Sequence, residues 1–232
     1  METSDFSQSR LIAWSEAHAF AMTLILGGIG FFGLAIGVLG MVALLSFMVL
    51  IGLCRRQWTP RGDFGAANVL TLLRLMGIAI LLVAPAPDKF IFSTLALLLL
   101  VMDAADGYIA RRLGTASEFG AFFDKEVDAF FMLALCVSLY AEHRFQAWIL
   151  VPGALRYAFV LLLRMVKPRH ASERRSALGR WIYALTMMAL IIAFLPFPRL
   201  AFVLVATMTV ALVYSFLLSL WHCYGPFAYP LR

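Results

Sequence analysis

Long apolar runs alternate with short polar breaks along this chain, and the pattern predicts membrane-spanning helices. A spanning α-helix needs about 20 predominantly apolar residues. From Phe64 onwards we expect six such helices, separated by breaks that contain proline, glycine and charged residues. They are predicted at residues 65–86, 90–111, 118–141, 146–166, 177–196 and 199–221.

The segment before these six helices is apolar but too long for one upright span. Residues 17–54 carry no charged side chain, and as a single helix they would extend about 57 Å, against a hydrocarbon core of about 30 Å. Either a helical hairpin breaks at glycines (within 27–30, or at Gly37 and Gly40), or one long tilted helix begins at the membrane interface. We expect the hairpin. Gly33 and Gly37, four residues apart, would suit a close helix contact but are also ordinary in membrane helices.

Composition agrees with a bilayer environment. Of 232 residues, 63% are hydrophobic and 14% are charged, and the mean hydropathy is +0.90. A water-soluble enzyme, a disordered tail and a secreted disulfide scaffold are therefore excluded, since a soluble domain cannot hide so much apolar surface. We expect an all-α integral membrane protein with two parts. Residues 1–63 form an N-terminal hydrophobic extension, with one or two extra membrane helices and a cytoplasmic linker, and residues 64–232 form a six-helix domain.

The formal net charge of +6 is best explained by membrane topology, and we expect no nucleic-acid partner. Basic residues collect in alternate breaks, and such breaks face the cytoplasm in multi-pass proteins. The only basic residues in the opposite breaks are Lys89, Arg144 and Arg199. The end of the second core helix and the start of the third should therefore face the cytoplasm, at the inner membrane if the protein is bacterial.

The three cysteines and four histidines show no spacing typical of a metal or redox site. We interpret Cys54, Cys136 and Cys223 as small core or lipid-facing residues. For the histidines we expect surface or interfacial positions. They are His18, His143, His170 and His222.

Acidic residues are concentrated in one short stretch. Six of the 13 acidic residues fall between Asp103 and Asp128. Asp103 and Asp106 are three apart, and Asp124 and Asp128 are four apart, so each pair shares one face of a helix. Carboxylates at or near membrane depth are costly and indicate function. Caps or solvated helix ends are the alternative for single aspartates, and an ion or proton pathway is the alternative for the group.

A tight loop between the two helices would bring these four carboxylates together. Divalent cations would relieve their repulsion, and oxygen-only ligands favour Mg²⁺ or Mn²⁺ over Zn²⁺. Two such ions suit in-line displacement at phosphorus. Gly107, Ala110 and Gly120 remove side chains beside the aspartates and leave room for a ligand, and Arg111 is placed to meet a phosphate.

The stretch resembles the signature of the CDP-alcohol phosphotransferase family, D-x-x-D-G-x-x-A-R-x8-G-x-x-x-D-x-x-x-D. All eight fixed positions match: Asp103, Asp106, Gly107, Ala110, Arg111, Gly120, Asp124 and Asp128. Asn68, Thr71 and Arg74 form a second resemblance, to the N-x-L-T-x-x-R start of that family's first helix, although the usual preceding proline is Ala67 here. The six-helix portion also agrees with the family's architecture.

The resemblance implies a role for each matching residue. Asp103, Asp106 and Asp124 would bind metal, and Asp128 would bind metal and act as the general base. Asn68, Thr71, Gly107, Ala110, Arg111 and Gly120 would surround the CDP group. The implied reaction moves a phosphatidyl group from CDP-diacylglycerol to a hydroxyl acceptor and releases CMP. The implied assembly is a homodimer among membrane lipids.

Basic residues offer a clue to the acceptor. Arg156 and Arg164, eight apart, resemble the paired arginines of phosphatidylglycerophosphate synthases, although Tyr157 and Met165 replace the glutamates that usually follow. With Arg112 and Arg180 they could form an acceptor-phosphate site, or they could be cytoplasmic-side charge. Glycerol 3-phosphate is the first expectation. Inositol phosphate, inositol, serine and choline stay open, as do a CDP-choline or CDP-ethanolamine donor acting on diacylglycerol and an ion-coupled transporter.

Overall fold

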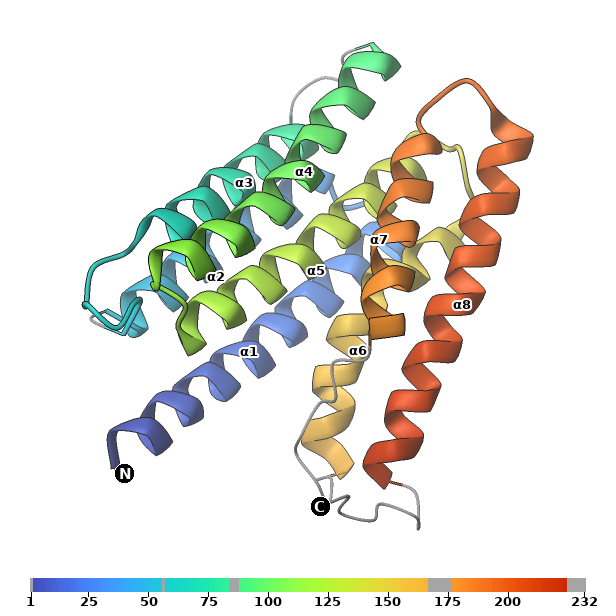
Figure 1. Cartoon of the computed structure of the whole chain (residues 1–232). Coiled ribbons are helices and arrows are strands. Elements are labelled where there is room, and N and C mark those ends of the chain that lie inside the picture. The colour runs from blue at the N-terminus through green and yellow to red at the C-terminus, as the bar shows by residue number, and fades with distance from the viewer. Residues whose placement is uncertain (1, 56, 84–87, 167–176, 225–232) are drawn as a thin grey trace.

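The computed structural model describes residues 2–55, 57–83, 88–166 and 177–224, apart from the side chains of residues 2–8, 104, 106, 108–111, 113, 166, 177 and 222–224. Every regular element in these ranges is helical, so the protein is all-α (Figure 1). The elements are α1 (Glu2–Phe32), α2 (Ile36–Leu53), α3 (Ala66–Val83), α4 (Lys89–Leu113), α5 (Glu118–Ala141), the 3₁₀ turn η1 (Ala147–Ile149), α6 (Leu150–Val166), α7 (Ala177–Ile192) and α8 (Pro198–Tyr224).

The N-terminal extension is a helical hairpin, as expected, but the position predicted for its break was wrong. Helix α1 runs through residues 27–30 without interruption, and the turn lies at 33–35. Gly33 has a φ of +66°, which glycine adopts readily because it has no Cβ. Gly33 and Gly37 therefore flank a turn and do not form a contact along one helix. The backbone N–H of Leu34 closes the turn on the Gly28 carbonyl oxygen at 3.1 Å.

Inside the hairpin, a histidine that we expected near the surface is buried and hydrogen-bonded. His18 is 1% exposed, its imidazole Nδ1 is hydrogen-bonded to the Ser46 hydroxyl at 2.9 Å, and its ring stacks on Trp14. The Trp14 indole N–H donates to the Ser46 carbonyl oxygen at 2.8 Å. The prediction for His18 was wrong because aromatic side chains from α1, α2 and α6 cover the ring and Ser46 hydrogen-bonds its Nδ1. His143 is exposed, whereas His170 and the side chain of His222 lie outside the described residues.

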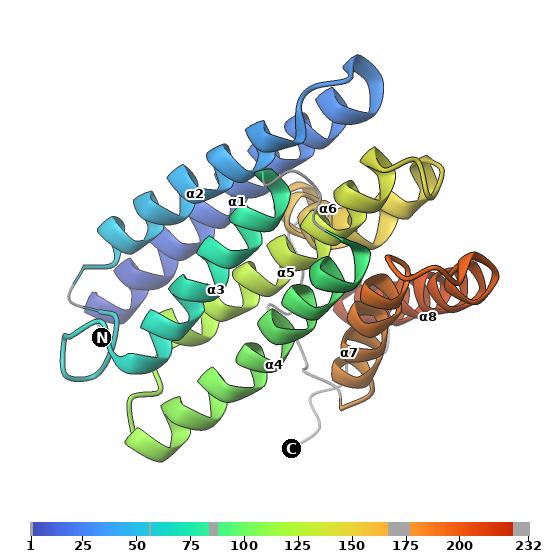
Figure 2. The ribbon, with the colours of Figure 1, turned by 90° about the horizontal axis from the view of Figure 1, so that it is seen from above.

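The six predicted core helices are present as α3 to α8, with ends that differ from the prediction by up to four residues. Helix α5 lies in the middle of the bundle and packs against α3, α6, α2 and α7 (Figure 2). Ser117 caps its start, because the hydroxyl accepts the Gly120 backbone N–H at 2.9 Å. From Ala129 to Leu139 every residue of α5 is buried, so the helix that carries two signature aspartates is also the core of the fold.

In the part of the chain that the structure describes, five helices are long and apolar enough to cross a membrane, which supports a multi-pass integral membrane protein. These stretches are Ser9–Phe32, Ile36–Leu53, Ala66–Val83, Ala147–Met165 and Pro198–Trp221. Helix α7 adds a shorter apolar stretch. Helices α4 and α5, with 25 and 24 residues, are also long enough to cross a membrane, but they carry the acidic residues of the signature. The end of α4 and the start of α5 lie at the same end of the bundle as the end of α6 and the start of α7 (Figure 1).

Candidate active site

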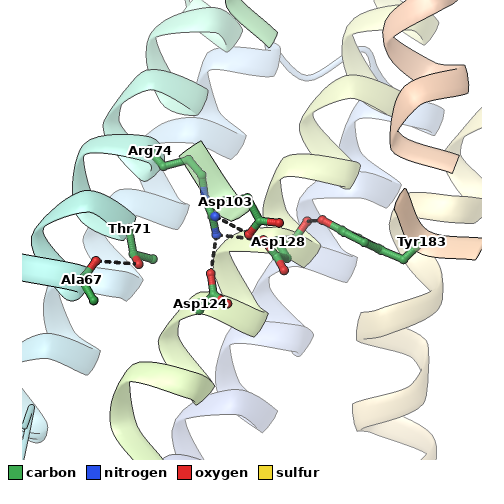
Figure 3. A network of polar contacts seen from close by, with 7 residues as sticks. All are labelled: Ala67, Thr71, Arg74, Asp103, Asp124, Asp128 and Tyr183. Carbon is green, nitrogen blue, oxygen red and sulfur yellow. Dashed lines mark hydrogen bonds and ion pairs between the residues drawn. The ribbon is translucent and has the colours of Figure 1, made fainter. Parts of the chain in front are cut away.

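Three signature aspartates from two helices meet in space. Asp103 comes from α4, and Asp124 and Asp128 come from successive turns of α5 (Figure 3). One carboxylate oxygen of each lies within 4.8 Å of the others. Their side chains are 25%, 35% and 23% exposed, so the cluster is partly open. Because α4 and α5 are joined by the short segment 114–117, three of the four aspartates that the sequence placed together lie close to one another.

Arg74 of α3 stands in the middle of this cluster, and sequence reasoning missed its role. Its Nη1 contacts Asp103 Oδ1, and its Nη2 lies 2.7 Å from Asp124 Oδ1 and 2.8 Å from Asp128 Oδ1 (Figure 3). The side chain is 1% exposed. A buried guanidinium with several carboxylate partners offsets their mutual repulsion and holds their geometry. The available signal was an arginine midway along an otherwise apolar helix.

Tyr183 of α7 also contacts the cluster, although no spacing in the sequence indicated it. Its hydroxyl donates to the backbone carbonyl oxygen of Asp128 at 3.3 Å (Figure 3). The bond ties α7 to the turn of α5 that carries the proposed general base. The contact depends on how the two helices pack, so local sequence could not reveal it.

The residues expected around CDP from α3 are buried beside the start of α5. Asn68 donates from Nδ2 to the carbonyl oxygens of Trp58 and Phe64 at 3.1 and 2.7 Å, and the Thr71 hydroxyl donates to that of Ala67 at 3.1 Å. A Cβ on Gly120 would stand 2.9 Å from Asn68 Oδ1. The absence of a side chain at Gly120 therefore lets α3 and α5 approach closely, next to the aspartates.

For most of the remaining signature positions, the structure describes the backbone but not the side chain. Gly107 is half-buried on α4. The backbones of Asp106, Ala110 and Arg111 also belong to α4, but their side chains lie outside the described residues. The predictions of a fourth aspartate ligand and of a phosphate-facing arginine therefore stay predictions.

The four arginines expected at the acceptor phosphate lie in different surroundings. Arg156 Nη2 is 2.5 Å from Glu126 Oε1, and Arg164 Nη1 is 3.2 Å from Glu16 Oε2. Arg156 is 19% exposed and Arg164 is 62% exposed. Arg112 and Arg180 are exposed, the former at the end of α4 and the latter in the first turn of α7.

The cluster fits a divalent cation. The three carboxylates offer oxygen ligands alone, the set that hard cations such as Mg²⁺, Mn²⁺ and Ca²⁺ take. The buried guanidinium of Arg74 shows independently that the site requires positive charge. An acidic site able to hold metal, built into a bundle of apolar helices, is the arrangement expected of a membrane-embedded enzyme of the metal-dependent phosphotransfer class.

Comparison with known proteins places the chain within this class. The model of the CDP-alcohol phosphatidyltransferase family matches residues 64–221, about two thirds of the chain, and the chain belongs to this family. The resemblance read from the signature is thereby confirmed. The matched region begins just before α3 and ends within α8, so α1 and α2 lie outside it.

Several curated relatives carry one name, CDP-diacylglycerol–glycerol-3-phosphate 3-phosphatidyltransferase. The Salmonella choleraesuis protein is 29% identical over 130 residues, covering 52% of this chain and 69% of the relative. The Cereibacter sphaeroides protein is 33% identical over 143 residues, covering 57% of this chain and 64% of the relative. The Escherichia coli protein is 28% identical over 130 residues, covering 52% and 69%. No solved structure matches the chain significantly.

Proposed function

We propose that this protein transfers the phosphatidyl group of CDP-diacylglycerol to glycerol 3-phosphate and releases CMP, as a step of phospholipid synthesis. The observation that carries the proposal is the convergence of Asp103, Asp124 and Asp128 inside the region matched by the family. The relatives' shared name supports the donor and the acceptor.

Asp103, Asp106, Asp124 and Asp128 would hold two ions, Mg²⁺ or Mn²⁺. Bound there, the ions supply positive charge that stabilises the diphosphate as the bond to CMP breaks. Before they bind, Arg74 keeps three of the carboxylates together, so the site is largely preformed. Asn68, Thr71, Gly107, Ala110, Arg111 and Gly120 would form the CDP site next to it.

Asp128 would act as the general base. It accepts the proton of the acceptor hydroxyl, whose oxygen bonds to the phosphorus nearest the lipid, while the bond from that phosphorus to the CMP oxygen breaks. The carboxylate is 23% exposed, which leaves it reachable. The hydrogen bond from Tyr183 to the Asp128 backbone holds this turn of α5 in place.

The acceptor phosphate would meet Arg112, Arg156, Arg164 and Arg180. Arg156 would have to reach the phosphate around α5, since the buried Glu126 that holds its guanidinium lies on the face of α5 turned away from the aspartates. The active site would face the cytoplasm, because the basic breaks gather at its end of the bundle. Residues 64–232 would form the catalytic domain and residues 1–63 its extension, and the protein would be a homodimer among membrane lipids.

The test is CMP release by the purified full chain in mixed micelles containing CDP-diacylglycerol. Glycerol 3-phosphate, inositol phosphate, inositol, serine and choline are supplied one at a time, with Mg²⁺ or Mn²⁺ and then with chelator. We expect release with glycerol 3-phosphate, and its loss with chelator and in Asp128→Asn.

Other outcomes would redirect the proposal. Release with a different acceptor alone would overturn the choice of glycerol 3-phosphate and keep the reaction. Activity with CDP-choline or CDP-ethanolamine and diacylglycerol would overturn the donor. Ion flux in proteoliposomes without CMP release under any condition would favour a transporter.

A further inference from the structure

Glu126 of α5 is a buried carboxylate that the proposed reaction does not use. It lies two residues from both Asp124 and Asp128, and two residues turn an α-helix by about 200°. Its side chain therefore points away from the aspartate cluster, and it is 1% exposed. A carboxylate at that depth is costly unless other groups compensate its charge.

The compensating groups come from two other helices. Arg156 of α6 approaches Glu126 Oε1 to 2.5 Å with Nη2. The Ser15 hydroxyl of α1 donates to the same oxygen at 3.3 Å, and Ser15 is also buried. One carboxylate oxygen thus joins α5, α6 and the N-terminal hairpin.

Aromatic packing attaches the hairpin to this same side of α5. The ring of Phe47, from α2, lies 5.9 Å from that of Phe123 and 6.2 Å from that of Phe130. Trp14 of α1 meets Phe122 edge-on at 5.9 Å. These side chains surround Glu126 along the helix, although α1 and α2 lie outside the region that the family model matches.

We propose that Glu126 is a positioning residue for the metal cluster. By joining α5 to α6 and α1, it sets the rotation of α5 about its axis and hence where Asp124 and Asp128 stand relative to Asp103. Sites of this kind must be held to within about 0.5 Å, so a small rotation of α5 weakens metal binding. The hairpin is thereby part of the catalytic unit. The inference rests on the proposed function in that it takes these aspartates as metal ligands.

The test compares three variants of the full chain in detergent. Glu126→Gln removes the charge and keeps the shape, and Ser15→Ala removes one hydroxyl. Glu118→Gln is the matched control, since Glu118 is exposed in the first turn of the same helix. Bound Mn²⁺ is measured from the loss of the free-ion signal in electron paramagnetic resonance, and size-exclusion chromatography selects the folded fraction.

We expect Glu126→Gln to weaken Mn²⁺ binding about 10-fold, the lower end of the range for residues that support metal ligands. Ser15→Ala should weaken it about 2- to 3-fold, because its bond is longer and involves no full charge. Glu118→Gln should bind Mn²⁺ as the unsubstituted protein does. In CMP release, Glu126→Gln should lower kcat with little change in the KM for CDP-diacylglycerol, and excess Mn²⁺ should restore part of the rate.

A folded Glu126→Gln protein that binds Mn²⁺ with unchanged affinity, even if it melts earlier, would overturn the inference, because a purely structural role affects stability alone. If Glu126→Gln does not fold, Ser15→Ala decides, and unchanged Mn²⁺ affinity in that variant would overturn it. If the unsubstituted protein binds Mn²⁺ but releases no CMP with any acceptor, the proposed function fails, and the Mn²⁺ comparison still judges Glu126.

Discussion

Two acid–arginine clusters lie on opposite faces of α5, and they differ in which charge is buried. On one face the arginine is the buried member, since Arg74 is 1% exposed while the aspartates around it are 23–35% exposed. On the other face the carboxylate is buried, since Glu126 is 1% exposed and Arg156 is 19% exposed.

The comparison shows which charge each cluster presents to a ligand. A charge buried among fixed partners is held in place, because leaving it without them would be costly. The more exposed members are the ones that can meet a ligand. The Arg74 cluster therefore presents carboxylates, which suit cations, and the Glu126 cluster presents a guanidinium, which suits an anion such as a phosphate. Because α5 separates the two clusters, Arg156 can meet the acceptor phosphate only by reaching around this helix toward the aspartates.

The largest effect should come from breaking the cation side at the proposed base. Asp128→Asn should lower CMP release about 10³-fold or more, because a general base contributes about 10²–10⁴-fold and a metal ligand is weakened as well. Asp88→Asn is the matched control, since Asp88 is exposed before α4, at the opposite end of that helix from the motif. If the Asp128→Asn protein kept undiminished turnover, Asp128 would not be the general base.

The next effect concerns the buried arginine. Arg74→Gln leaves three carboxylates facing one another and should cost about 2–4 kcal/mol of unfolding free energy in chelator, somewhat less than a fully buried pair because the aspartates are partly exposed. The thermal midpoint in detergent measures this loss, with the exposed Arg199→Gln as control. Added Mn²⁺ should stabilise Arg74→Gln more than it stabilises the unsubstituted protein. Equal midpoints in chelator would show that Arg74 does not compensate the cluster.

On the anion side, Arg156→Gln should lower stability as well as weaken acceptor binding, because it leaves the buried Glu126 without its charged partner. Arg156→Gln should raise the KM for glycerol 3-phosphate about 10-fold, since a charge-assisted hydrogen bond contributes about 1.5–3 kcal/mol. The KM for CDP-diacylglycerol should change much less. Arg156→Lys keeps the charge, so its KM for glycerol 3-phosphate should lie between those of the unsubstituted protein and Arg156→Gln. If folded Arg156→Gln shows an unchanged KM for the acceptor, Arg156 does not bind its phosphate.

The smallest effect should come from the exposed pair of α1 and α6. Glu16 and Arg164 lie 3.2 Å apart, but Arg164 is 62% exposed, and such pairs contribute at most about 1 kcal/mol. Glu16→Gln should therefore leave CMP release within about twofold and the thermal midpoint nearly unchanged. The neighbouring Ser15→Ala, which reaches the buried Glu126, should have the larger effect on Mn²⁺ binding. The opposite order would mean that the exposed pair, and not the buried carboxylate, attaches the hairpin.

Much of the fold followed from local pattern. Apolar runs of spanning length marked six core helices, and the uncharged length of residues 17–54 favoured a hairpin over one long tilted helix. The position of that turn was not predictable, because several glycines of the segment can adopt a positive φ and only the structure shows that Gly33 does. His18 was misplaced for a similar reason, since nothing in its own helix shows that Ser46 and Tyr157 will cover it.

The chain by itself determined the membrane environment, the helices and the aspartates of the signature, because hydrophobic length and helical spacing are properties of neighbouring residues. Tertiary structure decided which charges compensate one another. Arg74 lies 29 residues from Asp103 and 54 from Asp128, and Ser15 lies 111 residues from Glu126. Such pairs form where separate helices pack side by side, and in the low dielectric of that interior their geometry determines whether a buried charge is stable.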